Sequence, residues 1–306
     1  MIRASIDIGS NSILLLACEF NESTKKIEKE LLNLSSITSL GRDLDKTKRF
    51  HPDSMQATYD ALKHYRDQLI KIHFKAEDAI VTATEASRVA TNSAEFFAKI
   101  KEDLGFTITK ITADGEAHYT ALGVAAAVDS DSDIVIMDMG GASTELIKVG
   151  LHPFEIKTTI SMPIGSVRAT DWKKEGIFEN KVHEALNIDF EAYNTKNLVC
   201  VAGSMTSLAS MFSGHQEFKD REIDGLVIKF SSFQEFSRDL QKTNVENLLL
   251  LFPFLGKRAP MVAAASDVAE RIGKKLSIET MQISTRGLRY GVLIQGVIDD
   301  RFILSN

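Results

Sequence analysis

The sequence predicts a two-domain α/β protein with a duplicated plan, and three observations lead to this fold class. Strand-like apolar runs alternate with helix-like segments over most of the chain. Two similar turns follow such runs, and their leading acids, Asp7 and Asp138, lie 131 residues apart. The 306 residues also exceed the size at which a single hydrophobic core stops growing. We therefore expect one domain over residues 1–125 and another over 126–306, with a ligand in a cleft between them.

The first half of the chain is expected to start with strands and to continue with alternating helices and strands. Apolar alternation from Ile2 predicts three strands up to about Leu32, and Pro52 predicts the start of a helix that ends near His73. Strands are expected at 79–84 and 106–111, and helices are expected to end near residue 104 and to cover 114–128.

The second half repeats this order of elements. Strand-like runs are found at 133–137, 144–149, 155–162, 197–202 and 281–284. Helices are expected after residue 168, after residue 203, over 261–274, and from residue 286 onward.

Composition argues against several classes of function. The net charge of −6 disfavours a generic nucleic-acid binder, so an anionic ligand would have to be bound by local donors, metal ions and single basic residues. Cys18 and Cys200 have no partner at metal-ligand spacing, which favours a reducing, cytoplasmic compartment. No apolar run approaches the ~20 residues that a membrane span needs, so no membrane association is expected.

The two turns contain the residue types that a phosphate site needs. In the second turn, Gly140 and Gly141 have no Cβ, so their backbone N–H groups can approach an anion closely, and Ser143 adds a hydroxyl donor. Asp138 and Glu145 are acids that suit a divalent metal ion beside the phosphate. An ordinary glycine hairpin is the alternative for this turn taken alone.

Other polar residues also follow strands. Arg88 comes just after the predicted strand 79–84, Glu116 lies in the first turn of a predicted helix, and Gly203 with Ser204 opens another helix. Each has a structural alternative, such as a surface arginine or a helix-end acid. The polar segment 39–50 is expected to be a loop, and its basic residues either bind a polyanion or form a solvated face.

Taken together, these motifs resemble those of the exopolyphosphatase / guanosine pentaphosphate phosphohydrolase (Ppx/GppA) family in its short, two-domain form. The resemblance spans nearly the whole chain in the family's order. The matching segments are DIGSNS (7–12), ATEASRVATN (83–92), GEA (115–117), LGV (122–124), DMGGASTE (138–145), PIGSVR (163–168), VAG (201–203), RA (258–259) and RGLR (286–289).

The resemblance implies two ribonuclease-H-like domains of the actin/sugar-kinase superfamily, an active-site cleft between them, and a homodimer. Roughly the last 10–15 residues are expected to pack back on the first domain. The implied reaction is magnesium-dependent hydrolysis of a terminal phosphate, with Mn²⁺ as an alternative ion. Glu116 would be the general base, Arg88 would lie near the scissile phosphate, and Asp7, Asp138 and Glu145 would position the metal or water. The implied phosphate-binding residues are Gly9, Ser10, Asn11, Ser12, Gly140, Gly141, Ala142, Ser143, Gly203 and Ser204.

Leu14 and Ala142 are among the positions that depart from the family pattern. Leu14 lies beside the first turn where relatives carry a basic residue, and Ala142 replaces a third glycine. The expected substrate is inorganic polyphosphate. Guanosine pentaphosphate is a rival substrate, and a superfamily kinase and a non-catalytic sensor of polyphosphate or alarmone are rival functions.

Overall fold

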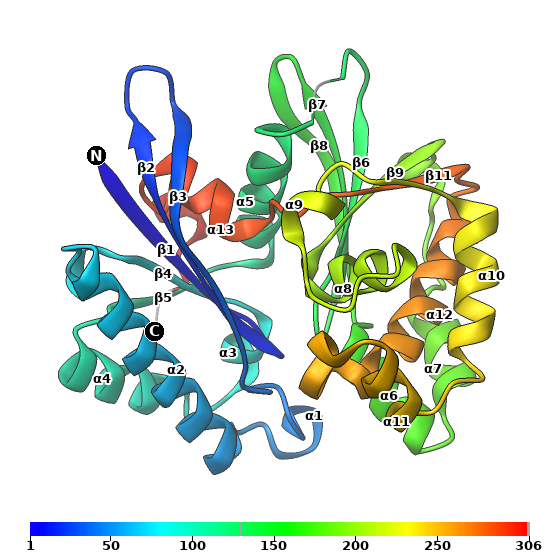
Figure 1. The fold of residues 1–306 in the computed structure, drawn as a ribbon, viewed down its shortest axis with the longest axis horizontal. Coiled ribbons are helices and arrows are strands. Elements are labelled where there is room, and N and C mark those ends of the chain that lie inside the picture. The colour runs from blue at the N-terminus through cyan, green and yellow to red at the C-terminus, as the bar shows by residue number, and fades with distance from the viewer. Residues whose placement is uncertain (129, 305–306) are drawn as a thin grey trace. The chain divides into compact units, whose positions relative to one another are not determined.

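The chain divides into two compact units in a computed structural model that describes residues 1–128 and 130–304 (Figure 1). The first unit consists of Met1–Gly123 together with Leu288–Asn306, and the second consists of Val124–Gly287. The sequence-based boundary lay between residues 125 and 126. The first unit is therefore built from both ends of the chain.

The first unit contains a five-stranded mixed sheet in the order β3-β2-β1-β4-β5. Its strands are β1 (Ile2–Ile8), β2 (Ser12–Asn21), β3 (Lys26–Ile37), β4 (Ile80–Ala83) and β5 (Ile108–Lys110). The first three strands pair antiparallel, whereas β1, β4 and β5 run parallel. The carboxyl ends of β1, β4 and β5 therefore lie at the same edge of the sheet.

The second unit repeats this strand order and adds one strand. Its sheet has the order β10-β11-β9-β6-β7-β8. The strands are β6 (Ile134–Met139), β7 (Thr144–Leu151), β8 (Phe154–Met162), β9 (Asn197–Val201), β10 (Val227–Lys229) and β11 (Thr280–Ile283). The order β8-β7-β6-β9-β11 corresponds to β3-β2-β1-β4-β5, which confirms the predicted α/β class with a duplicated plan.

Helices cover both sheets. In the first unit they are α1 (Leu44–Thr47), α2 (Pro52–Lys71), η1 (Ala76–Asp78), α3 (Glu85–Val89), α4 (Ser93–Leu104), α13 (Leu288–Gln295) and η4 (Asp300–Phe302), and α5 (Ala113–Ala125) leads into the second unit. In the second unit they are α6 (Ser166–Lys174), α7 (Phe178–Ala185), η2 (Glu191–Tyr193), α8 (Ala202–Phe212), α9 (Asp220–Ile223), α10 (Phe230–Leu240), α11 (Val245–Leu251), η3 (Pro253–Arg258) and α12 (Ala259–Lys275). None of the helices in the described residues is both long and apolar enough to cross a membrane.

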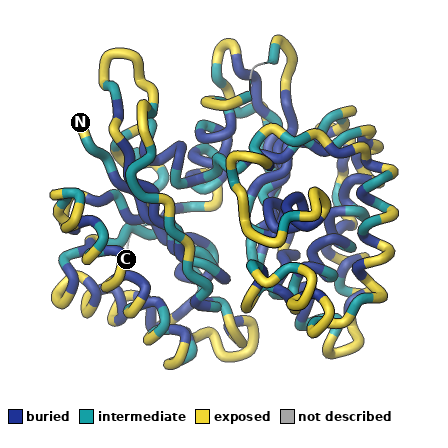
Figure 2. The backbone as a smooth tube through the Cα atoms, viewed as in Figure 1, coloured by how far each residue is buried: buried dark blue, intermediate teal, exposed yellow. Residues whose placement is uncertain are grey.

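Strand β2 is buried on both faces, which explains its continuous apolar sequence. Ile13 and Leu15 point into a core that also includes residues of α2 and α4. Leu16 and Phe20 point the other way and pack with Tyr290 of α13. Figure 2 shows the central strands of each sheet largely buried, whereas the outer strands β3 and β8 and the connecting loops are more exposed. Because β2 needs partners on both faces, the C-terminal helix α13 completes the core of the first unit.

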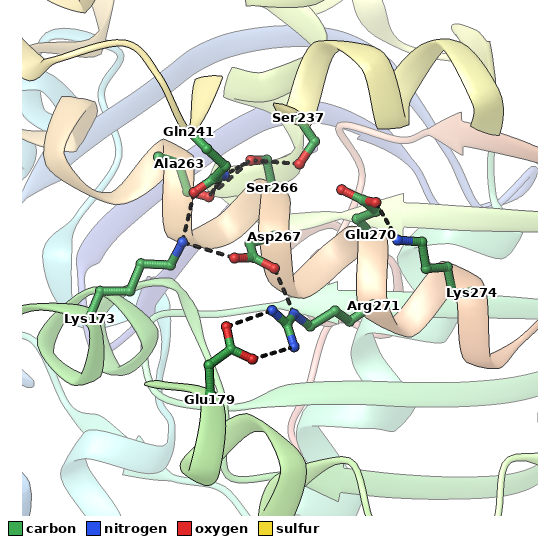
Figure 3. A network of polar contacts seen from close by, with 10 residues as sticks. All are labelled: Lys173, Glu179, Ser237, Gln241, Ala263, Ser266, Asp267, Glu270, Arg271 and Lys274. Carbon is green, nitrogen blue, oxygen red and sulfur yellow. Dashed lines mark hydrogen bonds and ion pairs between the residues drawn. The ribbon is translucent and has the colours of Figure 1, made fainter. Parts of the chain in front are cut away.

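A network of charged side chains joins the helices of the second unit (Figure 3). Asp267 of α12 accepts hydrogen bonds from Lys173 Nζ at 2.9 Å and from Arg271 Nε at 2.7 Å. Arg271 also donates two hydrogen bonds to Glu179 of α7, at 3.0 and 2.9 Å. Lys173 lies in the last turn of α6 and donates a further hydrogen bond to Gln241. The network therefore holds α6 against α7 and α12.

The polar segment 39–50 differs from its prediction as a loop. It contains the one-turn helix α1, which begins at Leu44 because that side chain is buried in the first core. The backbone at Asp43 and Lys48, on either side of this turn, has φ of 54°. Such conformations were not predictable from polarity alone.

Candidate phosphohydrolase site

The two predicted phosphate turns have the same backbone geometry. The amide of Gly9 donates a hydrogen bond to the carbonyl of Ser12 at 3.0 Å, and the amide of Gly140 does the same to Ser143 at 3.0 Å. Both turns join the first two antiparallel strands of their sheets. The duplication seen in the sequence is therefore also a duplication of turn structure.

The carbonyl groups of Gly140, Gly141 and Ala142 in the second turn are bound by the start of α6. The amides of Ser166 and Val167 donate to the carbonyls of Gly140 and Gly141 at 3.0 and 2.9 Å. Arg168 Nη1 donates to the carbonyl of Ala142 at 2.5 Å.

With its carbonyls held in this way, the turn presents its amides on the other side. Within the described part of the chain, the amides of Gly141, Ala142 and Ser143 donate no hydrogen bond. Ser143 and its hydroxyl lie at the same turn and are largely buried. Adjacent amides that need acceptors form an anion-binding concavity, so this turn suits a phosphate group.

The carbonyls of the first turn are also bound by backbone amides, but these come from the segment that follows β3. After β3, the amide of Gly41 donates to the carbonyl of Ser10 at 2.7 Å, and the amides of Thr38 and Ser39 both donate to the carbonyl of Asn11 at 3.0 Å. Ser10 and Asn11 are buried, and Asn11 Oδ1 has no hydrogen-bond partner in the described structure. A polar ligand or an ordered water is the usual partner of such a buried atom.

Gly165 permits the contact between α6 and the second turn. A Cβ at Gly165 would lie 2.5 Å from the carbonyl carbon of Gly141 and 2.6 Å from the nitrogen of Ala142. The hydroxyl of Thr144 donates to the carbonyl of Ile164 at 2.5 Å and fixes the same segment. Gly165 belongs to the motif PIGSVR (163–168), but its role in holding the turn is visible only in the fold.

Of the three acids predicted to position a metal ion, Asp138 and Glu145 lie together, whereas Asp7 belongs to the other unit. Asp138 and Glu145 lie directly opposite each other on β6 and β7, so their side chains project from the same face of the hairpin. Ser161 Oγ donates to Glu145 Oε1 at 2.6 Å, and Glu145 is only 3% exposed. In the first turn Asp7 lies opposite Leu14, which therefore occupies the position equivalent to Glu145.

The predicted catalytic pair Arg88 and Glu116 is in direct contact. Arg88 Nη1 donates to Glu116 Oε2 at 3.0 Å and to the carbonyl of Ile111 at 3.0 Å. Their side chains are 18% and 14% exposed. Arg88 is therefore not an isolated surface arginine, and Glu116 is not only a helix-end acid. The two side chains form one partly buried ion pair.

Sheet register explains why this pair lies near the first turn. Ile8 at the end of β1 pairs with Ala83 at the end of β4, and Ala83 pairs with Lys110 at the end of β5. The turn, the helix that carries Arg88 and the helix that carries Glu116 therefore leave the same edge of the sheet. Ligand sites in α/β sheets are typically found at the carboxyl ends of the strands.

Gly203 and Ser204 lie at the equivalent edge of the second sheet. Asp138 of β6 pairs with Val201 of β9, and α8 begins at the next residue. Ala202 has φ of 75°, a left-handed conformation that costs roughly 1–2 kcal/mol for a residue with a side chain. The start of α8 therefore lies beside the second turn.

Arg258 is a further cation at the start of α8, and sequence analysis gave it no role. Its Nη1 donates to Ser207 Oγ at 3.1 Å, and a Cβ at Gly203 would lie 2.8 Å from its Nη2. Burial lowers the pKa of Arg258 from its ordinary value. Its presence in the matched RA motif was the available sequence signal, but only the fold places it against Gly203.

The fold and these sites define a duplicated α/β protein with a phosphate-type turn in each unit. Residues 22–298 match the Ppx/GppA phosphatase family, and the chain belongs to this family. The predicted resemblance is thereby confirmed.

Proteins of similar sequence fall in the same group. The guanosine-5'-triphosphate,3'-diphosphate pyrophosphatase of Vibrio cholerae is 28% identical over 98% of this chain and 60% of its own length. A bifunctional 3-dehydroquinate synthase/phosphatase of Fusobacterium nucleatum is 27% identical over 97% of this chain and 46% of its own length. Exopolyphosphatase 2 of Mycobacterium tuberculosis is 26% identical over 95% of this chain and 97% of its own length. The chain thus spans about half of the first two relatives and nearly all of the third.

Solved structures share the fold. A crystal structure of an exopolyphosphatase from Cytophaga hutchinsonii has a TM-score of 0.86 at 23% identity and covers 97% of this chain and 99% of its own. The Aquifex aeolicus member of the Ppx/GppA family has a TM-score of 0.76 at 24% identity and covers 96% and 97%. These likenesses support the two-unit architecture.

Proposed function

We propose that the protein is a phosphohydrolase that releases the terminal orthophosphate of inorganic polyphosphate. The observation that carries this proposal is the ion pair of Arg88 and Glu116 at the sheet edge where the first phosphate turn lies. A carboxylate held in a fixed orientation beside an anion-binding turn is suited to activating a water molecule.

In the proposed reaction, Glu116 accepts a proton from water while the water oxygen attacks the terminal phosphorus atom. The P–O bond to the bridging oxygen breaks, and the shortened chain leaves with that oxygen. Arg88 orients Glu116 and stabilises the negative charge of the phosphoryl group. The backbone amides of the turns bind phosphate oxygens, which is the main task of the protein in phosphoryl transfer.

We further propose that Mg²⁺, or alternatively Mn²⁺, assists this reaction. The opposed carboxylates of Asp138 and Glu145 fit such an ion, since Mg²⁺ commonly uses one or two protein carboxylates together with waters and phosphate oxygens. Asp7 is the corresponding acid of the first unit. Among the described residues no group of three or more His, Cys, Asp or Glu side chains could hold a metal ion. The bound ion would neutralise charge on the phosphate oxygens.

The relatives support two substrates of the same chemical kind. Exopolyphosphatase 2 of M. tuberculosis matches this chain over nearly its full length, which favours polyphosphate. The V. cholerae pyrophosphatase supports guanosine pentaphosphate as the rival substrate. The cleft between the two domains and a homodimer stay predictions.

Phosphate release tests the proposed function. Short-chain polyphosphate, long-chain polyphosphate and guanosine pentaphosphate are each incubated with the protein, once with Mg²⁺ and once with chelator. We expect release from polyphosphate that stops with chelator. Release only from guanosine pentaphosphate would change the substrate, whereas binding without any release would support the sensor function.

A further inference from the structure

The first unit contains a cavity that is lined by none of the residues assigned to phosphate hydrolysis. It has a volume of about 990 Å³ and is lined by residues of α1 and the loops around it, the start of α2, and α4 with the residue before it. Binding sites for drug-sized ligands are typically about 300–1,000 Å³. The cavity is therefore large enough for a small organic molecule.

One part of the cavity wall is basic. Four Lys and Arg residues line it against two acids, although the whole chain has a net charge of −6. Arg42 forms long ion pairs with Asp43 at 3.4 Å and Asp53 at 3.7 Å, and Lys99 pairs with Asp103 at 2.9 Å.

Arg49 differs from these two cations. Within the described residues, its side chain has no carboxylate within ion-pair distance. Arg49 is exposed, so an anionic group bound in the cavity would replace water as the partner of this guanidinium with a charge-assisted hydrogen bond. The basic wall thus favours a ligand with phosphate or carboxylate groups.

The other part of the wall is aromatic and held rigidly. Phe50 and Phe96 are buried and pack edge to face with ring centroids 6.2 Å apart. Tyr59 and Met55, which are partly exposed, form the accessible part of this wall. Asn92 accepts a hydrogen bond from the amide of Phe50 at 2.8 Å and donates one to its carbonyl at 3.3 Å. The apolar surface is therefore fixed before any ligand arrives.

From this combination we propose that the cavity binds a nucleoside polyphosphate, with its phosphates at Arg49 and its ring system on the Tyr59 side. An inorganic phosphate chain would use the basic wall and leave the aromatic surface in water. A purely apolar ligand would cover the Lys and Arg side chains of the basic wall without offering them a hydrogen-bond acceptor, which is unfavourable. Only a ligand with both a flat ring and anionic groups uses both walls. This inference does not rest on the proposed hydrolysis.

Calorimetric titration of the full chain tests the proposal. Adenosine and guanosine triphosphates are the probes, inorganic tripolyphosphate is the comparison without a ring, and chelator prevents turnover. We expect binding of at least one triphosphate, weakened about 10- to 100-fold by Arg49→Glu, the size of a lost hydrogen bond to a charged group. Tyr59→Ala should weaken nucleotide binding and leave any tripolyphosphate binding unchanged.

Matched variants separate this cavity from the phosphate turns. Lys63→Ala changes an exposed lysine of α2 that does not line the cavity, and it should have no effect. Arg88→Ala should leave the Arg49-dependent binding intact, and Arg49→Glu should leave phosphate release from polyphosphate unchanged. Nucleotide binding that is insensitive to Arg49→Glu but lost in Arg88→Ala would overturn the proposal, and so would the absence of triphosphate binding to the unaltered protein.

Discussion

A single missing Cβ at Gly165 allows α6 to hold the second phosphate turn. Gly165→Ala would place a methyl group 2.5 Å from the Gly141 carbonyl carbon, so the turn or the helix has to move. We predict that phosphate release falls about 10²-fold, the loss expected from a displacement of about 1 Å at a reacting group. The measurement is kcat/KM on short-chain polyphosphate.

Ser166→Ala is the control for this prediction. It keeps the backbone amide that binds Gly140 and removes only a hydroxyl at 3.3 Å from the same carbonyl. Its effect should be several times smaller. Unchanged activity in Gly165→Ala would show that the position of the turn is not critical.

Sequence and structure agree best at the residue scale where a residue type is chemically restricted. Gly9 and Gly140 were predicted to lie in two similar turns because tight turns favour residues without a side chain, and both turns have the same backbone hydrogen bond. Metal binding by the acids beside them stays a prediction. The contact of Arg88 with Glu116 could not be derived from the residues alone, because it depends on the pairing of β1, β4 and β5.

At the scale of elements, the position of α6 depends on the charged network at its C-terminal end. Burial raises the pKa of Asp267, but hydrogen bonds from Arg271 and Lys173 outweigh it and hold the pKa below its ordinary value of 3.8. Because the pKa is lower in the folded state, the ionised carboxylate stabilises the fold above the unfolded-state value. This stability is lost as the pH falls through the folded-state pKa.

Asp267→Asn should therefore lower the free energy of unfolding by about 1–3 kcal/mol at neutral pH, since hydrogen bonds to a charged group are lost. The difference from the unaltered protein should shrink below pH 3.8. Urea unfolding of both proteins, from neutral pH to below pH 3.8, measures this difference in the free energy of unfolding. Asp239→Asn, which removes an exposed ion pair with Lys242, is the control and should change little. A difference that is independent of pH would contradict the role of the charge.

The packing of α13 on α5 gives a second prediction for an element. A Cβ at Gly291 would lie 1.8 Å from the carbonyl oxygen of Tyr119, one turn after Glu116. Gly291→Ala should lower the melting temperature of the first unit by several degrees, because overpacking typically costs about 1–3 kcal/mol. Gly287→Ala, whose added carbon would meet nothing within 4 Å, should leave the melting temperature nearly unchanged.

Several elements with regular apolar spacing were predicted from the sequence, but α10 was not, although its buried residues Phe230, Phe233, Ser237 and Leu240 also repeat at helical spacing. The helix predicted over 52–73 is α2, Pro52–Lys71, because its apolar residues repeat at helical spacing and proline marks its start. Sequence analysis missed β10, a three-residue strand at the sheet edge. This strand is defined by its antiparallel pairing with β11, and a run of three residues is too short to predict such pairing from the sequence.

At the scale of the whole molecule, the two units differ in how the chain builds them. The second unit is one continuous segment with its own large core, whereas the first needs α13 to cover Leu16 and Phe20 of β2. We predict that residues 124–287 expressed alone unfold cooperatively on heating and that residues 1–123 alone do not. Circular dichroism melting of the two fragments checks this, and a cooperative transition for 1–123 would contradict it.

In the proposed reaction, Glu116 activates water for the release of terminal phosphate. The most direct test of this role compares Mg²⁺-dependent phosphate release from short-chain polyphosphate by the unaltered protein, by Glu116→Gln, and by Asp114→Asn, which changes an exposed acid two residues away. We predict a loss of about 10²–10⁴-fold for Glu116→Gln, as for other general bases, and near-normal release for Asp114→Asn. Equal release by Glu116→Gln and the unaltered protein would contradict the claim.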